Sequence, residues 1–294
     1  MVVPGVGLEP TRVASADFKY QSSGIDLGTD LLNAFLQSRR DGISPNTIEF
    51  YSTYLRRCAT VLIPSVSIKA LSEFIKTRKC SSGGKHAYYR VLRVYFNWLF
   101  SVKSGQHLNI GDNPIVHIDP PKVERKILPS LSIEQVENLL EQAETIQDKA
   151  IISLFVDSGL RLSELASIKV VNIDWNNRLI KARCKGNKEG LAPFGVRTEM
   201  FLKNWLAESD GTENLWNTNG EGIYEMLRKL RDKTGLPCNP HTFRRTFASL
   251  LAKRGVDSLH IMRLGRWESI QMVERYTRSV RFDDSLKLYR PIMD

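Results

Sequence analysis

The sequence has little cysteine and no long apolar run. It holds four cysteines in 294 residues, none of them in a Cys-x-x-Cys pair, so neither a disulfide framework nor a zinc site is indicated. No apolar run reaches the roughly 18 residues that a membrane span needs. Met1–Tyr20 also lacks the basic start and apolar block of a signal peptide. We therefore expect a cytoplasmic protein with free thiols, no bound metal and no membrane partner.

The composition is that of a globular protein with an excess of positive charge. Hydrophobic residues make up 42% of the chain and charged residues 25%, and the length suffices for two domains with real cores. The formal net charge is +10. Such a surplus favours a polyanionic partner, most often nucleic acid, although many basic proteins bind none.

Composition along the chain predicts two domains after an irregular arm. Residues 1–24 carry Gly, Pro and Ser without periodicity, and a helical pattern then covers residues 25–118. Two prolines in series interrupt it within residues 119–129, which we interpret as a linker. The remainder, residues 130–294, forms the second domain.

The first domain is expected to be a small helical module with a basic face. Ser44-Pro45 has the pattern of a helix start, and apolar residues recur at helical spacing in Lys85–Val102. Residues 25–118 hold 12 Lys and Arg against 6 Asp and Glu. Lys85, Arg90 and Arg93 are therefore candidates for contacts with a phosphate backbone. The alternative is a solvated basic face without a ligand.

The second domain is expected to be mainly helical with one small antiparallel sheet. A capping box at Ser132–Gln135 opens its first helix. The segments 178–183 and 191–194 are predicted to form two strands of a hairpin, with Lys185-Gly186-Asn187 at the turn. Helical patterns follow from Arg197 to the end, and no internal repeat is visible.

Two arginines in this domain have the surroundings of a phosphate site. Arg161 follows Ser158-Gly159-Leu160, where the glycine is expected to break a helix and turn the arginine inward. Arg244 follows His241 by three residues, so both project from one helix face. Arginine stays charged and binds bidentately, which suits the negative charge that gathers on a phosphodiester under attack. A surface salt bridge is the alternative for either arginine alone.

A tyrosine and a lysine complete the expected chemistry. Tyr276, on a predicted short helix Ser269–Tyr276, is the candidate nucleophile. A phenol has a pKa of about 10 and needs nearby cations or a base to attack at neutral pH. Lys185 or Lys188, near the predicted hairpin turn, is the candidate general acid for the departing oxygen.

Three further residues are expected to support this pocket. His241 is a candidate to hydrogen-bond a non-bridging oxygen or to relay the tyrosine proton. Trp267 is a candidate to donate its indole N–H to the phosphate, with packing as the alternative. Glu164, three residues after Arg161 and expected on the same helix, would orient an arginine or the histidine, unless it is an exposed helical acid.

At these residues the chain resembles the tyrosine recombinase (phage integrase-like, Xer-like) family. The resemblance covers about residues 25–290 and follows five motifs in order. They are Ser-Gly-Leu-Arg161-x-x-Glu164, Lys185-Gly-Asn-Lys, His241-x-x-Arg244, Leu-Gly-Arg-Trp267 and Tyr276. Many members have histidine directly after Leu-Gly, whereas this chain has Arg266 there. Because Trp267 lies nine residues before Tyr276, we take Trp267 as the equivalent residue and Arg266 as its neighbour.

The resemblance implies a fold and an activity. A helical core-binding domain and a catalytic domain would form a C-shaped clamp around duplex DNA. Four protomers would act on two specific attachment sites, through 3′-phosphotyrosyl links and a Holliday junction, without metal or nucleotide. The resemblance also favours Lys185 over Lys188 as the general acid and a role in a mobile genetic element. A type IB topoisomerase and a DNA-binding regulator with an inactive pocket are the alternatives.

The arm offers one further hypothesis. Gly7-Leu8-Glu9-Pro10 can be encoded by GGxCTCGAACC, which could be the complement of a tRNA T-arm. Family members that integrate mobile elements often choose the ends of tRNA genes. The gene would then overlap its own attachment site.

Overall fold

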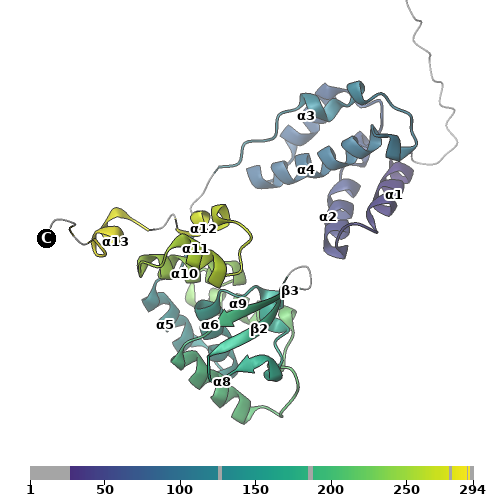
Figure 1. Cartoon of the computed structure of the whole chain (residues 1–294). Helices are drawn as coiled ribbons and strands as arrows, with labels where there is room; N and C mark the ends of the chain where they lie inside the picture. Colours follow the sequence, from purple (N-terminus) through teal and green to yellow (C-terminus); the bar gives the residue numbers. More distant parts are fainter. Residues whose placement is uncertain (1–26, 125–127, 185–187, 278–279, 290, 292–294) are drawn as a thin grey trace, which may run out of the picture. The chain divides into compact units, whose positions relative to one another are not determined.

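The structure, a computed structural model, describes residues 27–124, 128–184, 188–277, 280–289 and 291. The chain divides into two compact units, Met1–Arg125 and Lys126–Asp294 (Figure 1). This boundary falls within residues 119–129, the expected linker. The expected arm 1–24 and Lys185 lie outside the described residues. Among the described helices, none is both long and apolar enough to cross a membrane.

The first unit is helical. Its α-helices are α1 (Leu27–Arg39), α2 (Pro45–Arg56), α3 (Ile68–Thr77) and α4 (Ser82–Leu99). A 3-10 helix at Ala59–Val61 lies between α2 and α3, and three more follow α4 at Val102–Ser104, Ile110–Asp112 and Pro114–His117. The side chains of Ser44, Ser67 and Ser81 cap α2, α3 and α4 by accepting a backbone N–H. These caps satisfy amides that a helix start leaves without a partner.

Helix α4 supplies more of the core of the first unit than any other described element does. The predicted apolar stripe is buried and packs on residues of the other three helices, among them Phe35, whose ring meets Tyr95 edge-on at 5.5 Å. The helix is shifted from the predicted Lys85–Val102, because Ser81 caps it earlier and the chain turns at Phe100. Arg90 and Arg93 are exposed, whereas the Lys85 ammonium donates to the Lys76 carbonyl at 2.5 Å.

The second unit joins nine α-helices and a three-stranded sheet within its described residues. The helices are α5 (Ile133–Gln142), α6 (Ile146–Ser158), α7 (Leu162–Ala166), α8 (Val196–Glu208), α9 (Gly220–Thr234), α10 (Pro240–Lys253), α11 (Ser258–Leu264), α12 (Ile270–Thr277) and α13 (Phe282–Leu286), with a 3-10 helix at Val170–Asn172. Ser132 and Gln135 form the predicted capping box of α5. The expected mainly helical class with a small antiparallel sheet is confirmed.

The sheet is antiparallel and has the order β1-β2-β3. Its strands are β1 (Ile173–Asp174), β2 (Leu179–Cys184) and β3 (Lys188–Pro193). The predicted hairpin is present, but β3 begins three residues before the predicted Leu191 and ends at Pro193. The sequence analysis missed β1, because a strand of two residues carries no alternation pattern.

Helix α10 is the central element of the second unit. Asn239 caps it and Pro240 occupies its first turn, as the sequence Asn-Pro predicts. Phe243 on α10 stacks on Phe155 of α6 with ring centroids 5.5 Å apart, and α11 and α12 gather around the other end of α10 (Figure 1). Residues far apart in sequence therefore meet around this helix.

Candidate active site

The turn after α6 places Arg161. Gly159 ends α6 in the left-handed conformation, with φ of +57°, which glycine adopts without steric cost. The chain then leaves the helix axis and Arg161 becomes the N-cap of α7. The expectation that Arg161 and Glu164 share a helix is therefore corrected: Arg161 precedes the helix, because its backbone is extended, and Glu164 lies in the first turn.

Glu164 is a buried partner of Arg161. Its side chain is 2% exposed, and its carboxylate accepts the Arg161 amide at 2.9 Å and the Arg161 guanidinium at 2.5 Å. Burial alone would raise the pKa of Glu164, but these bonds and the charges of Arg161 and Arg266 hold the pKa below its ordinary value. The carboxylate is therefore ionised at neutral pH and fixes Arg161.

Helix α10 carries His241 and Arg244, which line one cavity together with Arg161. His241 is exposed in the first turn, whereas Arg244 is 4% exposed. The Arg244 guanidinium donates to the carbonyl of Gly159 and, at 2.5 Å, to the carbonyl of Gly265. These bonds use two of its five N–H donors, so three remain for an anion as far as the described residues are concerned.

The surroundings of Arg244 are positively charged. Burial, followed by the charges of Arg161 and Arg266, lowers the pKa of Arg244 to about 10, which still leaves it charged at neutral pH. The Glu164 carboxylate has the opposite effect and raises the pKa of Arg244. It lies 2.5 Å from Arg161 and 3.8 Å from Arg266. Three guanidinium groups thus face one carboxylate, an excess of two positive charges.

Trp267 lies between Arg244 and Tyr276. The Arg244 guanidinium carbon is 4.2 Å from the centre of the indole, and the Tyr276 ring centroid is 5.5 Å from that of Trp267. Trp267 is 5% exposed and packs in a cluster with Phe247. Its indole N–H is buried and has no hydrogen-bond acceptor within the described part of the chain. Trp267 is therefore a packing residue whose N–H donor also lacks an acceptor in the described structure.

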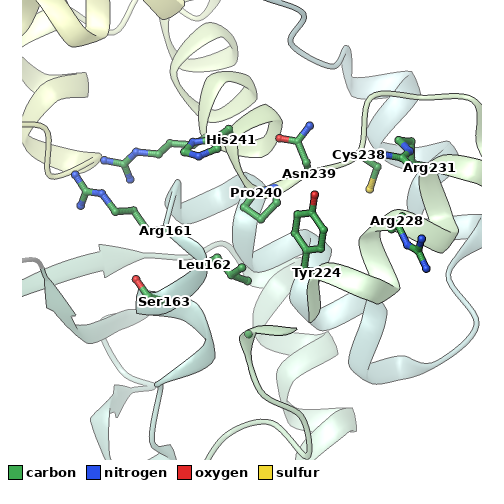
Figure 2. A pocket seen from close by; sticks show the side chains of 12 residues that line it. Arg161, Leu162, Ser163, Tyr224, Arg228, Arg231, Cys238, Asn239, Pro240 and His241 are labelled. Atoms are coloured by element: carbon green, nitrogen blue, oxygen red, sulfur yellow. The ribbon is translucent and has the colours of Figure 1, made fainter. Parts of the chain in front are cut away.

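A cavity of about 600 Å³ opens beside the arginines. Arg161, His241 and Arg244 line it together with Tyr224, Arg228, Arg231, Cys238 and Asn239, among others. Figure 2 shows Arg161 and His241 at one end of it and Arg228 and Arg231 at the other, with Tyr224 between. Tyr276 is not among the lining residues. Its half-buried ring contacts Trp267, and it acts electrostatically on Arg244, whose pKa it raises.

The sequence analysis missed the residues that α9 gives to the cavity. Tyr224, Arg228 and Arg231 recur at i, i+4 and i+7, a helical spacing that places them on one face and that could have revealed them. Cys238 also lines the cavity, but burial raises the pKa of its thiol to about 12. It therefore stays protonated and is a poor nucleophile at neutral pH.

Two further arginines near the site were missed. Arg266 donates through its guanidinium to the carbonyls of Leu191, Leu264 and Ser158. Arg245 donates to the Pro129 carbonyl at 2.9 Å and to the Thr242 hydroxyl at 2.9 Å, which ties α10 to the start of the second unit. Apart from Thr242 and Leu264, their partners are backbone carbonyls remote in sequence, which no sequence pattern indicates.

The remaining candidates belong to other parts of the chain. Lys85, Arg90 and Arg93 belong to α4 in the first unit. Lys185 lies outside the described residues, and the competing Lys188 is the first residue of β3. The structure thus groups Arg161, Glu164, His241, Arg244, Trp267 and Tyr276 around α10.

Comparisons with known proteins identify a family for the chain. The model of the family described as the phage integrase family matches residues 129–281. The tyrosine recombinase XerA of Saccharolobus solfataricus is 27% identical over 284 residues, which cover 88% of this chain and 93% of XerA. The tyrosine recombinase XerC of Thermodesulfovibrio yellowstonii is 31% identical over 209 residues, covering 63% of this chain and 68% of XerC.

Solved structures share the fold at lower identity. A dimer of lambda integrase residues 75–356 bound to a COC′ core site has a TM-score of 0.72 at 15% identity and covers 90% of this chain and 99% of that one. The site-specific recombinase XerH, bound to a palindromic difH substrate after cleavage, has a TM-score of 0.69 at 20% identity and covers 89% of this chain and 82% of XerH.

Proposed function

Since the chain belongs to the phage integrase family and is a tyrosine-type site-specific recombinase, we propose that Tyr276 is its nucleophile. In this proposal Arg161 and Arg244 hold the DNA phosphate that Tyr276 attacks, with His241 and Trp267 as further donors and Glu164 as the partner that fixes Arg161. The product of cleavage is a 3′-phosphotyrosyl link between the DNA and Tyr276.

The excess of two positive charges around Arg244 is the observation that supports this role most strongly. A phosphodiester carries one negative charge, and attack by an ionised phenol brings a second to the phosphoryl oxygens. The unbalanced guanidinium groups match that transition state better than the ground state, which is the condition for catalysis. Removing one such preorganised donor typically costs on the order of 3 kcal/mol of transition-state stabilisation.

The chemical step conserves atoms and charge without an external reagent. The Tyr276 hydroxyl loses its proton, with His241 as the relay, and its oxygen forms a bond to phosphorus. The bond from phosphorus to the 5′ oxygen breaks, and Lys185 protonates that oxygen as general acid, ahead of the competing Lys188. A 5′ hydroxyl of another strand reverses the step. The phosphotyrosyl link stores the energy of the broken bond, so the proposal needs neither metal nor nucleotide.

The indole of Trp267 adds a specific argument. A buried donor without an acceptor costs about 1–3 kcal/mol, and Trp267 carries one beside the Arg244 guanidinium. A phosphate oxygen held by Arg244 would supply the missing acceptor after a small movement of the ring. This supports the donor role over simple packing.

The biological setting is a finer proposal. We infer that the enzyme acts in the cytoplasm as a homo-tetramer on two specific attachment sites, exchanges strands through a Holliday junction and serves a mobile genetic element. A transposon integrase among the similar folds favours element mobility, whereas the Xer relatives favour a resident recombinase. Sequencing the DNA trapped on the enzyme tests this. Trapped DNA that comes from the ends of a mobile element would support mobility. The same reads test whether the gene segment that encodes the arm overlaps the end of a tRNA gene.

The first unit is proposed to grip the DNA backbone. Arg90 and Arg93 are exposed on one face of α4, as phosphate contacts require. Lys85 is a weaker member of the set because its ammonium already donates to Lys76. Charge removal at Arg90 and Arg93 should weaken binding and lower its dependence on salt.

A nicked suicide DNA substrate carrying the attachment site tests the proposed chemistry. The native chain should form a covalent adduct, and Tyr276→Phe should form none because it lacks the attacking oxygen. An adduct that persists in Tyr276→Phe would remove Tyr276 from the role of nucleophile. Absence of any adduct with the native chain would favour the DNA-binding regulator.

A two-site assay distinguishes the enzymatic alternatives. A recombinase should join strands from two sites into a four-way junction. Relaxation of supercoiled DNA without such a junction would favour a type IB topoisomerase.

A further inference from the structure

Arg266 stands where a glycine would be expected. Its φ of +55° lies in the left-handed region, which among the described non-glycine residues only His107 and Arg178 share. An L-residue there is strained, because its Cβ lies too close to the following carbonyl oxygen. Backbone strain of this kind persists when the surrounding structure compensates for it. The side chain of Arg266 supplies that compensation.

The guanidinium of Arg266 connects elements that are remote in sequence. Its side chain is 8% exposed. One terminal nitrogen donates to the Leu191 carbonyl of β3 at 3.0 Å and to the Leu264 carbonyl at 2.8 Å, and the other donates to the Ser158 carbonyl at the end of α6 at 3.0 Å. Its Nε lies 3.8 Å from the Glu164 carboxylate of α7. Hydrogen bonds from a charged donor are stronger than those between neutral groups.

These contacts join three parts of the proposed active site. Arg266 directly precedes Trp267 and stands in the segment that leads to Tyr276. Ser158 and Glu164 flank Arg161. Leu191 belongs to the β2–β3 hairpin, whose strands enclose Lys185 in the sequence. The residue before Arg266 has no room for a side chain, because a Cβ on Gly265 would lie 1.8 Å from the Trp267 ring.

We propose that Arg266 is a positioning residue that holds the β2–β3 hairpin in register with the arginine pair. Its terminal nitrogens donate to carbonyls, so it acts mainly through the hairpin and reaches the phosphate only through its charge. This inference rests on the proposed function and deepens it, because the candidate general acid lies between the two strands of the hairpin in the sequence. Loss of the guanidinium leaves Arg161, Arg244 and the nucleophile in place and lowers the excess charge by one, but its main effect is to misplace the proton donor for the departing 5′ oxygen. A misplacement of about 1 Å can cost about 100-fold in rate.

Arg266→Gly isolates the side chain from the backbone. Glycine adopts the left-handed conformation without cost, so this variant keeps the turn and loses only the guanidinium. Arg266→Lys keeps the charge but cannot donate to three carbonyls from a planar fork. Arg263→Ala is the matched control, since Arg263 is an exposed arginine in the last turn of α11.

The test compares two substrates under single-turnover conditions at saturating DNA. One is the natural phosphodiester, and the other has sulfur in place of the bridging 5′ oxygen. A thiolate leaves without a proton, because a thiol has a pKa of about 8.5, so this substrate needs no general acid. We expect Arg266→Gly to cleave the natural substrate about 100-fold more slowly and to recover most of that loss on the sulfur substrate. Arg266→Lys should show a smaller loss with the same recovery.

Several outcomes would overturn the inference. These are a native rate in Arg266→Gly, an equal loss on both substrates, or a loss confined to DNA affinity. If Arg266→Gly does not fold, the same comparison with Arg266→Lys decides. Failure of the proposed function itself would look different: the native chain would then form no adduct with either substrate.

Discussion

Replacement of Gly159 by alanine tests how the motif Ser158-Gly159-Leu160-Arg161 builds the site. Gly159 has a φ of +57°, and an added Cβ would lie 2.6 Å from Cδ1 and 2.9 Å from Cγ of Phe247. The left-handed backbone costs an alanine about 1 kcal/mol. Overpacking against a buried ring adds about 1–3 kcal/mol. The sum is about 2–4 kcal/mol of folding free energy.

Gly235→Ala is the matched control for this substitution. Gly235 also ends a helix in the left-handed conformation, with φ of +69°, but no atom lies within 4 Å of an added Cβ. It should therefore cost only the backbone part, about 1 kcal/mol. For a unit of this size 1 kcal/mol lowers the melting temperature by about 2–4 °C. We expect a loss of about 5–15 °C in Gly159→Ala.

Tryptophan fluorescence during thermal unfolding of the full chain measures this difference. Of the five tryptophans, Trp98 alone belongs to the first unit, so the signal reports mainly on the second. Cleavage should also fall in Gly159→Ala, because Phe247 packs on Trp267 and the Gly159 carbonyl holds Arg244. Equal melting temperatures and equal cleavage in the two variants would refute this reasoning.

Two further predictions concern the partners of the arginines. Glu164→Gln should destabilise the chain by about 2 kcal/mol at neutral pH. Because the pKa of Glu164 is lower in the folded chain, glutamate stabilises the fold more than glutamine does above the ordinary pKa of 4.5, and this difference is lost as pH falls through the lower folded pKa. Urea unfolding of both chains at several pH values measures the difference in unfolding free energy. A difference that does not change with pH would contradict the prediction. Trp267→Phe should change the unfolding free energy by less than about 1.5 kcal/mol, because the lost N–H has no acceptor in the described structure. The same variant should cleave DNA about 100-fold more slowly. Unchanged single-turnover cleavage would assign Trp267 to packing alone.

Local signals allowed much of the fold to be predicted from the sequence. The caps at Ser44 and Ser132, the break at Gly159 and the start of α10 at Asn239-Pro240 all depend on neighbouring residues. Such interactions span one turn of a helix, so a short stretch of sequence contains both partners. The order of the motifs then indicated which residues to group.

Contacts between remote residues could not be predicted in this way. The burial of Glu164, the carbonyl contacts of Arg266 and the position of Trp267 under Arg244 depend on how α6, α7, α10 and β3 pack. Arg266 illustrates the limit: beside Trp267 in the sequence it was taken as a neighbour, and only the folded chain brings its guanidinium to three carbonyls.

The identity of the attacking tyrosine is the central claim, and the structure offers a rival for it. Tyr224 lines the cavity with Arg161 and His241, whereas Tyr276 does not line it and packs on Trp267. Mass spectrometry of the proteolysed covalent adduct decides between them. We expect a nucleotide attached through a 3′ phosphate to the peptide that contains Tyr276. The same modification on the Tyr224 peptide would contradict it.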